Sequence, residues 1–508
     1  MKKLWKLMLC FFLGGTLVAC GDTPEERRNH LNAAMFWIST TLDPASNYDG
    51  WVLSRIGVGE TLVKLNENYE VVPGLADTYE QINATTWHLH IREHLNFSNG
   101  KAVDGEDVKA CLERAFAKNS RAKEYFDLAA VEAEGQDVML YLNTPSGAVL
   151  NNLCEPLFTI YDASQSDDVI SRQPSCTGPF VITDFKPEIS VDCVANENYW
   201  DGEVQLASVH FVQVADADAR VLALQNGEVD MVTTIDYSNV SLFSDPEKYS
   251  VSEVLGPRCN VVYLNHESPF LQDVHIRKAL SYAVDRNSIV ALTGGDPAVG
   301  LYSTALPYGN DVKNGYPLDL DKANQILDKA GYIDTDQDGI REMNGQNIVL
   351  QYYESADHGS SDANIIAQSI QSDAAKIGLS IEIKAVENLS DIKASGTFDM
   401  CSANDSTAPT GDPEIFLQLH YLSDASGNIS RYKNAQIDAL INELSVTFDN
   451  EKRQALAKTV SEMLLEDAVN LYVSYLPLNT ICLSKVKGAV QHPVDYYMMT
   501  KDISIDNG

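Results

Sequence analysis

The first twenty residues combine a basic start with a short apolar run. Lys2, Lys3 and Lys6 precede a stretch of mostly apolar residues from Leu7 to Ala19. A helix that crosses a bilayer needs about 20 apolar residues, so this run is too short to span and has the length of a signal-peptide core. The pattern therefore predicts a signal peptide over residues 1–19.

The apolar run ends on a cysteine, and a glycine and an aspartate follow it. Residues 17–20, Leu-Val-Ala-Cys, resemble a bacterial lipobox, in which the cysteine is acylated and becomes the mature N-terminus. The alternative is an ordinary cleaved signal peptide with an incidental cysteine. Because charge, length and lipobox agree, we expect a lipid on Cys20 and a tether over residues 20–30. The protein would then lie on the extracytoplasmic face of the cell membrane, in a periplasm or on the outer surface.

Strand-like and helix-like patterns alternate from residue 31 to the end of the chain. Residues 31–38 have a strand pattern, and residues 85–103 alternate like a hairpin closed by Ser98-Asn99-Gly100. A helix is expected next, with Asp104 as its N-cap and an apolar face. Alternating strands and helices favour an α/β fold, and a chain of 508 residues is too long for a single core.

Composition adds two exclusions. The formal net charge of −35 repels nucleic acid, so no nucleic-acid partner is expected. Seven cysteines remain besides Cys10 of the signal peptide and Cys20, and no C-x-x-C pair occurs among them. An odd number cannot all pair, so the pattern is typical of neither a disulfide scaffold nor a zinc module. One bridge, for instance between Cys176 and Cys193, stays open.

The order of the segments resembles a known family along most of residues 31–490. "VVPGLADTYE", "TWHLHIREHLNFSNGKAVDGEDVKACLERAF" and "CTGPFVITDFKPEISVDCVANENYW" are similar to the opening half of the peptide/nickel class of ABC-importer solute-binding proteins. "ARVLALQNGEVDMV", "VHIRKALSYAVDRNSIV" and "GDPEIFLQLHY" continue the same order. These six belong to a set of eight such segments, and eight in the right order make this resemblance specific.

The resemblance implies a two-lobed periplasmic-binding-protein fold of type II, in its large class with an extra inserted subdomain. Lobe I would comprise residues 31–256 plus 473–508, with the inserted subdomain at about 61–177, and lobe II residues 257–472. A two-stranded hinge would join the lobes, which close on a solute. The implied partners are a peptide or other small solute and the permease and ATPase subunits of an importer. A monomer is expected, attached to the membrane through its lipid only.

No catalytic set with a motif-defined spacing is visible, so the sequence predicts neither an enzyme nor a cofactor. One acidic cluster and one imidazole cluster resemble metal sites at first sight. Asp334, Asp336 and Asp338 begin like a calcium loop, but the twelfth position is Gly345 rather than glutamate, which favours a plain turn. His88, His90 and His94 are interpreted as solvated strand histidines, so no metal site is predicted.

The ligand question centres on residues 401–417, "CSANDSTAPTGDPEIFL". In the peptide branch of the family an aspartate three residues before Asp-Pro anchors the ligand's amine, and here that position is Pro409. In the nickel branch a tryptophan and a tyrosine frame Ala-Pro, and here Ser406 and Thr410 stand in their places. The arginines that grip the chelate in that branch are not clearly present either. The resemblance therefore leaves the ligand open.

Several polar or aromatic residues are candidates for ligand binding. Tyr48 and Trp51 offer flat faces in a loop after the first strand. We expect a strand ending at Tyr353, with the following loop at its carboxyl end. The ligand-binding candidates are Tyr48, Trp51, Glu354, Asp357, His358, Asp405, Ser406 and Thr407. Because Glu354, Asp357 and Asp405 suit a cation, the sequence favours a peptide or other amine-bearing solute. A nickel or metal chelate is the alternative, and a surface peptidase is a remote one.

The lipid anchor can be tested directly. Replacing Cys20→Ser removes the thiol that would carry the lipid, so we expect the protein to leave the membrane and to fold normally. Detergent-phase partitioning of wild type and variant measures this. A variant that stays in the detergent phase would contradict the lipobox interpretation.

Overall fold

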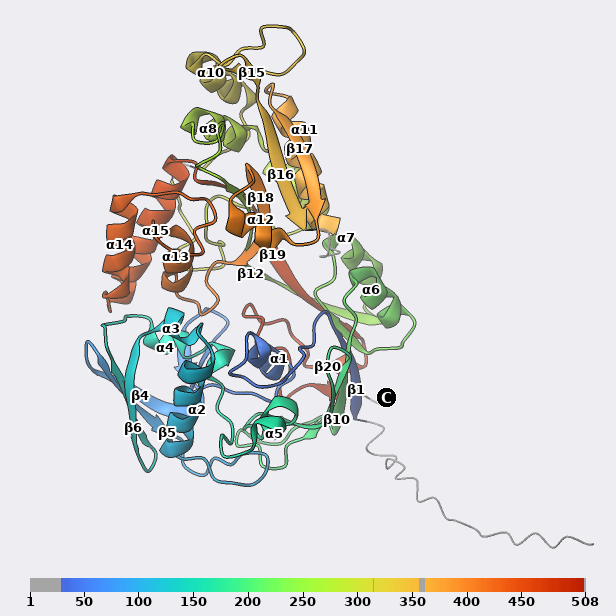
Figure 1. The fold of residues 1–508 in the computed structure, drawn as a ribbon. Coiled ribbons are helices and arrows are strands. Elements are labelled where there is room, and N and C mark those ends of the chain that lie inside the picture. Colours follow the sequence, from blue (N-terminus) through green and yellow to red (C-terminus); the bar gives the residue numbers. More distant parts are fainter. Residues whose placement is uncertain (1–28, 314, 356–360, 507–508) are drawn as a thin grey trace, which may run out of the picture.

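A central mixed sheet organises the protein, a computed structural model that describes residues 29–313, 315–355 and 361–506 (Figure 1). The sheet has 11 strands in the order β17-β16-β18-β12-β19-β11-β1-β10-β9-β8, with β13 paired to β19 off this path. The predicted α/β class is thus confirmed. Its strands are β1 (His30–Met35), β8 (Phe180–Lys186), β9 (Ser190–Ala195), β10 (Ser208–Gln213), β11 (Met231–Thr233), β12 (Tyr249–Leu264), β13 (Asp296–Pro297), β16 (Val349–Ser355), β17 (Ser380–Val386), β18 (Met400–Ser406) and β19 (Asn470–Leu483).

The antiparallel pair β12 and β19 joins the two halves of this sheet. The strands have 16 and 14 residues, and the register between them shifts from Leu255 to Cys259. Pro257 lies within that shift, where its missing N–H costs no ladder hydrogen bond. On one side the sheet continues through β18, and on the other through β11. The segments "LGPRCNVVYLN" and "NLYVSYLP", where the family resemblance would place the two crossings between lobes, lie on these two strands.

A second, antiparallel sheet of 4 strands lies beside the amino-terminal half, in the order β4-β5-β7-β6. Its strands are β4 (Ala76–Asn83), β5 (Thr86–Ile91), β6 (Leu128–Glu134) and β7 (Asp137–Leu142). Helix α2 (Gly105–Lys118) packs on it and begins with a capping box between Asp104 and Asp107, which confirms the predicted N-cap.

The long hairpin predicted over residues 85–103 is wrong. Strand β5 ends at Ile91 and forms its hairpin with β4 instead. His94 adopts a left-handed backbone with φ 64°, which a continuing strand does not tolerate. The Ser98-Asn99-Gly100 turn closes only an isolated bridge between Asn96 and Ala102.

The helices cover the faces of the central sheet and fill the space between the sheets (Figure 1). The remaining helices are α1 (Asp49–Arg55), α3 (Ala122–Tyr125), α4 (Val149–Asn152), α5 (Asp167–Arg172), α6 (Ala217–Gln225), α7 (Tyr237–Val240), α8 (Val274–Ala283), α9 (Arg286–Thr293), α10 (Leu320–Ala330), α11 (Ser361–Ala375), α12 (Leu389–Ser395), α13 (Glu414–Tyr421), α14 (Ala435–Ser445) and α15 (Asn450–Glu466), with 3-10 turns η1 (Pro156–Phe158) and η2 (Ser241–Phe243). Short strand pairs are β2 (Val63–Leu65) with β3 (Val71–Pro73), β14 (Glu342–Met343) with β15 (Gln346–Asn347), and β20 (Val486–Lys487) with β21 (Ser504–Ile505). None of the helices in the described ranges combines the length and apolar character needed to cross a bilayer.

The cysteines are small apolar side chains in this fold. All seven that the described ranges contain are buried and free, including Cys176 and Cys193, so the bridge left open between these two is not formed. Burial raises the pKa of the thiols, for example that of Cys111 to about 12. Cys20 lies outside the described residues.

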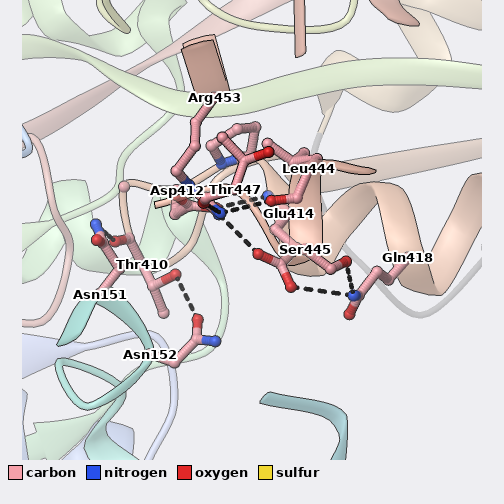
Figure 2. Close-up of polar contacts among 12 residues, drawn as sticks. Asn151, Asn152, Thr410, Asp412, Glu414, Gln418, Leu444, Ser445, Thr447 and Arg453 are labelled. Carbon is pink, nitrogen blue, oxygen red and sulfur yellow. Dashed lines mark hydrogen bonds and ion pairs between the residues drawn. The ribbon is translucent and has the colours of Figure 1, made fainter. Parts of the chain in front are cut away.

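A buried ionic cluster holds α13, α14 and α15 together (Figure 2). The Arg453 guanidinium donates to both carboxylate oxygens of Asp412, at 3.0 and 2.6 Å, and to Glu414 at 2.7 Å. It also donates to the backbone carbonyls of Leu444 and Thr447 at 2.7 and 2.8 Å. The three charged side chains are 3 to 7% exposed, so none can be hydrated instead.

Removing this arginine should destabilise the protein strongly. Arg453→Met leaves two carboxylates buried without a cation, which costs roughly 3–5 kcal/mol of unfolding free energy. Lys452→Met is the matched control, because Lys452 pairs with Glu443 at the surface and should cost less than about 1 kcal/mol. Urea unfolding of both variants measures the difference. Equal midpoints would show that the buried cluster adds no stability.

Candidate functional site

The first group of candidate residues gathers around α1. The Arg121 guanidinium lies 3.6 Å from the centre of the Tyr48 ring, a cation–π arrangement. The Trp51 indole N–H donates to Glu155 at 2.7 Å, and its ring meets that of Tyr496 edge to face at 5.0 Å. Tyr48 itself is 50% exposed, so solvent reaches its ring, which is the ring that the Arg121 cation contacts.

Glu155 fixes the geometry of this group. Its side chain is fully buried and accepts hydrogen bonds from Trp51, from Arg121 at 3.2 Å and from the Tyr496 hydroxyl at 3.1 Å. Burial alone would lower the pKa of Arg121, but Tyr125 and Glu155 outweigh it and raise that pKa. The guanidinium therefore stays charged, and its hydrogen bond to the Glu155 carboxylate sets its orientation.

The second group lies at the carboxyl end of β18. The Tyr263 hydroxyl donates to Asp405 at 2.5 Å, and the Tyr263 ring stacks on His420 at 6.4 Å. His420 also packs on Phe416 at 4.3 Å, and its Nδ1 hydrogen bonds to the Gly427 carbonyl at 3.0 Å. Burial lowers the pKa of His420, although Asp405 opposes the shift in part. A neutral imidazole and a carboxylate thus stand side by side.

Segment 407–412 connects the two groups. The Tyr496 hydroxyl, which binds Glu155, also donates to the Pro409 carbonyl at 3.0 Å. Helix α3, which follows Arg121, contacts α13, which carries His420. Asp495 is paired with Arg55 of α1 at 2.9 Å and with Arg258 of β12 at 3.4 Å. Segment 407–412 thus follows Asp405 along the chain and contacts the α1 group through Tyr496.

Two other candidates, at the end of β18 and the start of this segment, are used by the fold. Thr407 is fully buried, and its hydroxyl donates to the Pro257 carbonyl at 2.9 Å. Ser406 is the last residue of β18 and pairs with Arg258 of β12. In the described arrangement both therefore help to attach β18 to the β12–β19 pair.

The structure does not bring Glu354 to Asp405. Strand β16 continues to Ser355 because Glu354 and Ser355 pair with β17, so the predicted strand end at Tyr353 is wrong. In the parallel register Tyr353 stands opposite Cys401, so Glu354 and Asp405 point to opposite faces of the sheet. Glu354 accepts from Asn364 of α11 at 3.1 Å. Asp357 and His358 lie outside the described residues.

The two clusters that resemble metal sites have hydrogen-bond partners nearby. His88 and His90 both bind Asp137, each at 2.8 Å. The carboxylates of Asp334, Asp336 and Asp338 are exposed and lie within 4.8 Å of one another. Asp334 accepts from the backbone amides of its own turn, as expected for an acidic turn.

Five residues of the two groups were missed by sequence reasoning. They are Arg121, Glu155, Tyr263, His420 and Tyr496. No motif spacing links them, because they come from segments that meet only in the folded chain. The resemblance implies arginines that grip a chelate in the nickel branch, but Arg121 carries no local pattern that marks it as one of them.

The chain belongs to the bacterial extracellular solute-binding proteins, family 5, whose middle region matches residues 70–428. It is therefore the solute-binding component of an ABC importer of the peptide or nickel class. The expected family and fold are confirmed.

Relatives within this family have different named ligands. The nickel-binding protein NikA of Staphylococcus aureus is 26% identical over 508 residues, which cover 99% of this chain and 100% of that protein. The dipeptide-binding protein of Escherichia coli is 24% identical and covers 94% of this chain and 92% of its own. The structure of the S. aureus protein in complex with Ni(L-His)2 superposes with a TM-score of 0.80 at 24% identity, over 94% of this chain and all of that one. A nickel ABC transporter structure from Bacillus halodurans gives 0.79 at 27% identity, with the same coverage.

The role of Glu155 in fixing the α1 group can be measured. Glu155→Gln removes the charge that Arg121, Trp51 and Tyr496 share, so we expect a loss of about 2–3 kcal/mol of unfolding free energy. Glu132→Gln is the control, because Glu132 accepts from Tyr141 at the exposed face of the second sheet. It should change stability by less than about 0.5 kcal/mol. Similar urea midpoints for the two variants would contradict the assignment.

Proposed function

We propose that this protein is a lipid-anchored, extracytoplasmic binding component that captures nickel complexed by a small organic chelator and delivers it to the importer's permease. The observation that carries this proposal is the state of His420. Its Nδ1–H is held by the Gly427 carbonyl, and its Nε2 has no hydrogen-bond partner in the described part of the chain. A neutral imidazole anchored through one nitrogen is a preferred ligand for nickel through the other.

The α1 group supports the same proposal from the other side of segment 407–412. Tyr48 and Trp51 supply the flat faces that Ser406 and Thr410 cannot supply, and Arg121 supplies a cation for the chelator's carboxylates. A chelate would then contact His420 through the metal and Arg121 through its organic part. Binding and handover need no catalytic group, which fits a non-enzymatic role.

Capture would use two lobes that close. Lobe I would comprise residues 31–256 and 473–508, with the inserted subdomain at about 61–177, and lobe II residues 257–472. The hinge would be the register shift of β12 and β19 between Leu255 and Cys259, where the ladder is interrupted and bending is easiest. A monomer anchored by Cys20 would present its closed form to the permease and its ATPase.

A peptide or other amine-bearing solute is the second candidate, and one observation favours it. Asp405 accepts from Tyr263 through Oδ2, while its Oδ1 has no hydrogen-bond partner in the ranges that the structure describes. A partly buried carboxylate oxygen of this kind suits an ammonium group. Asp405 could thus replace the amine anchor that Pro409 has removed.

Calorimetry on two variants separates these cargoes. With nickel and histidine as the probe, His420→Ala should weaken binding at least about tenfold, or ~1.4 kcal/mol, because the metal loses a ligand. His275→Ala is the control, because His275 is an exposed residue of α8. Peptide binding that occurs without metal, survives His420→Ala and drops by roughly 2–5 kcal/mol in Asp405→Asn would replace the nickel proposal with the peptide one.

A further inference from the structure

The segment before α4 and the turn after α14 approach each other closely at Gly147. Its N–H donates to the Ser445 carbonyl at 2.8 Å. A Cβ added at Gly147 would lie 2.1 Å from the Thr447 carbonyl oxygen and 2.3 Å from Nη1 of Arg453. Real Cβ atoms do not approach backbone this closely, so only glycine fits while the two parts are in contact.

The surface that receives Gly147 is held by the ionic cluster described above. Nη1 of Arg453 donates to the carbonyls of both Leu444 and Thr447, which flank the end of α14. Because Arg453 is fixed by Asp412 and Glu414, this turn cannot yield to an extra methyl group without disturbing three buried charges. The contact is therefore rigid on the α13–α15 side.

Further hydrogen bonds join α4 to segment 407–412 beside this contact (Figure 2). The Asn151 side chain donates to the Thr410 carbonyl at 3.0 Å, and the Thr410 hydroxyl donates to the Asn152 side chain at 3.3 Å. Thr410 is fully buried between α4 and the start of α13. Close approach at Gly147 and these polar contacts thus belong to one interface.

We propose that this interface, made by Gly147, Asn151 and Asn152 against Thr410 and the α14–α15 turn, is the contact that holds the two lobes closed. The inference rests on the proposed function, because it assigns the two sides to lobes that separate about the β12–β19 hinge. Because the interface includes Thr410 of segment 407–412, the closing contact would lie next to the proposed cargo site. A methyl group at Gly147 would then act as a wedge that favours the open form.

The test compares Gly147→Ala with wild type and with Gly315→Ala. Gly315 is the matched control, because an added Cβ there would lie 3.5 Å from the Val299 carbonyl oxygen, at ordinary contact distance. We expect Gly147→Ala to have a larger radius of gyration than the other two in small-angle scattering, with and without nickel and histidine. Its affinity for nickel with histidine should be at least tenfold weaker. Thermal unfolding checks that each variant is folded.

The outcomes separate this inference from the cargo proposal. Wild type that binds no nickel complex would count against the cargo, while the radii of the ligand-free proteins still decide the closing contact. Equal radii for all three proteins would overturn the inference. If Gly147→Ala does not fold, Thr410→Val takes its place, because it removes only the hydroxyl bond to Asn152. An unchanged radius and affinity in that variant would then overturn it.

Discussion

The pairing of β12 with β19 is the constraint on which the rest of the structure depends. These two strands lie in the middle of the central sheet, and every other strand of that sheet is attached to one side of the pair or the other. Asn260 to Tyr263 of β12 pair with residues before Pro477, and Tyr249 to Leu255 pair with residues from Pro477 onward. The interruption between them lies next to the point where β18 ends and segment 407–412 begins.

That location explains why charged side chains collect there. Segment 407–412 leaves the sheet and must satisfy its backbone without a ladder, and it does so through Pro257, Tyr496 and Asn151. Asp495 and Glu155 then neutralise the arginines that surround this segment. Because Glu155 and Asp495 are both paired with arginines, their burial does not leave an uncompensated charge.

The sequence predicted the fold far better than the site. The ordered family segments and the Asp104 cap depend on local patterns that the chain carries within about fifteen residues of each other. The site depends on pairs such as Trp51 with Glu155 and Tyr263 with Asp405, which are 104 and 142 residues apart. The placement of Glu354 depends on strand length and register. Strand β16 is two residues longer than predicted, so Glu354 lies within the ladder and on the face of the sheet opposite to Asp405. His94 shows the reverse error, where an alternating pattern ran through a left-handed residue.

The composition of the two groups bears on the form of metal that the proposed site would accept. A bare divalent cation needs several hard or imidazole ligands from the protein. The two groups offer one neutral imidazole, one carboxylate shared with Tyr263, and the carboxylate of Glu155, which is already bound to Arg121. The Arg121 cation, kept charged by Glu155, would repel an uncomplexed ion. A chelate that brings its own carboxylates would be attracted to Arg121 instead of repelled. Its carboxylates would fill the metal's coordination shell and give Arg121 an anion to bind. The overall charge of −35 attracts cations to the surface, so discrimination against bare metal has to be made within the site.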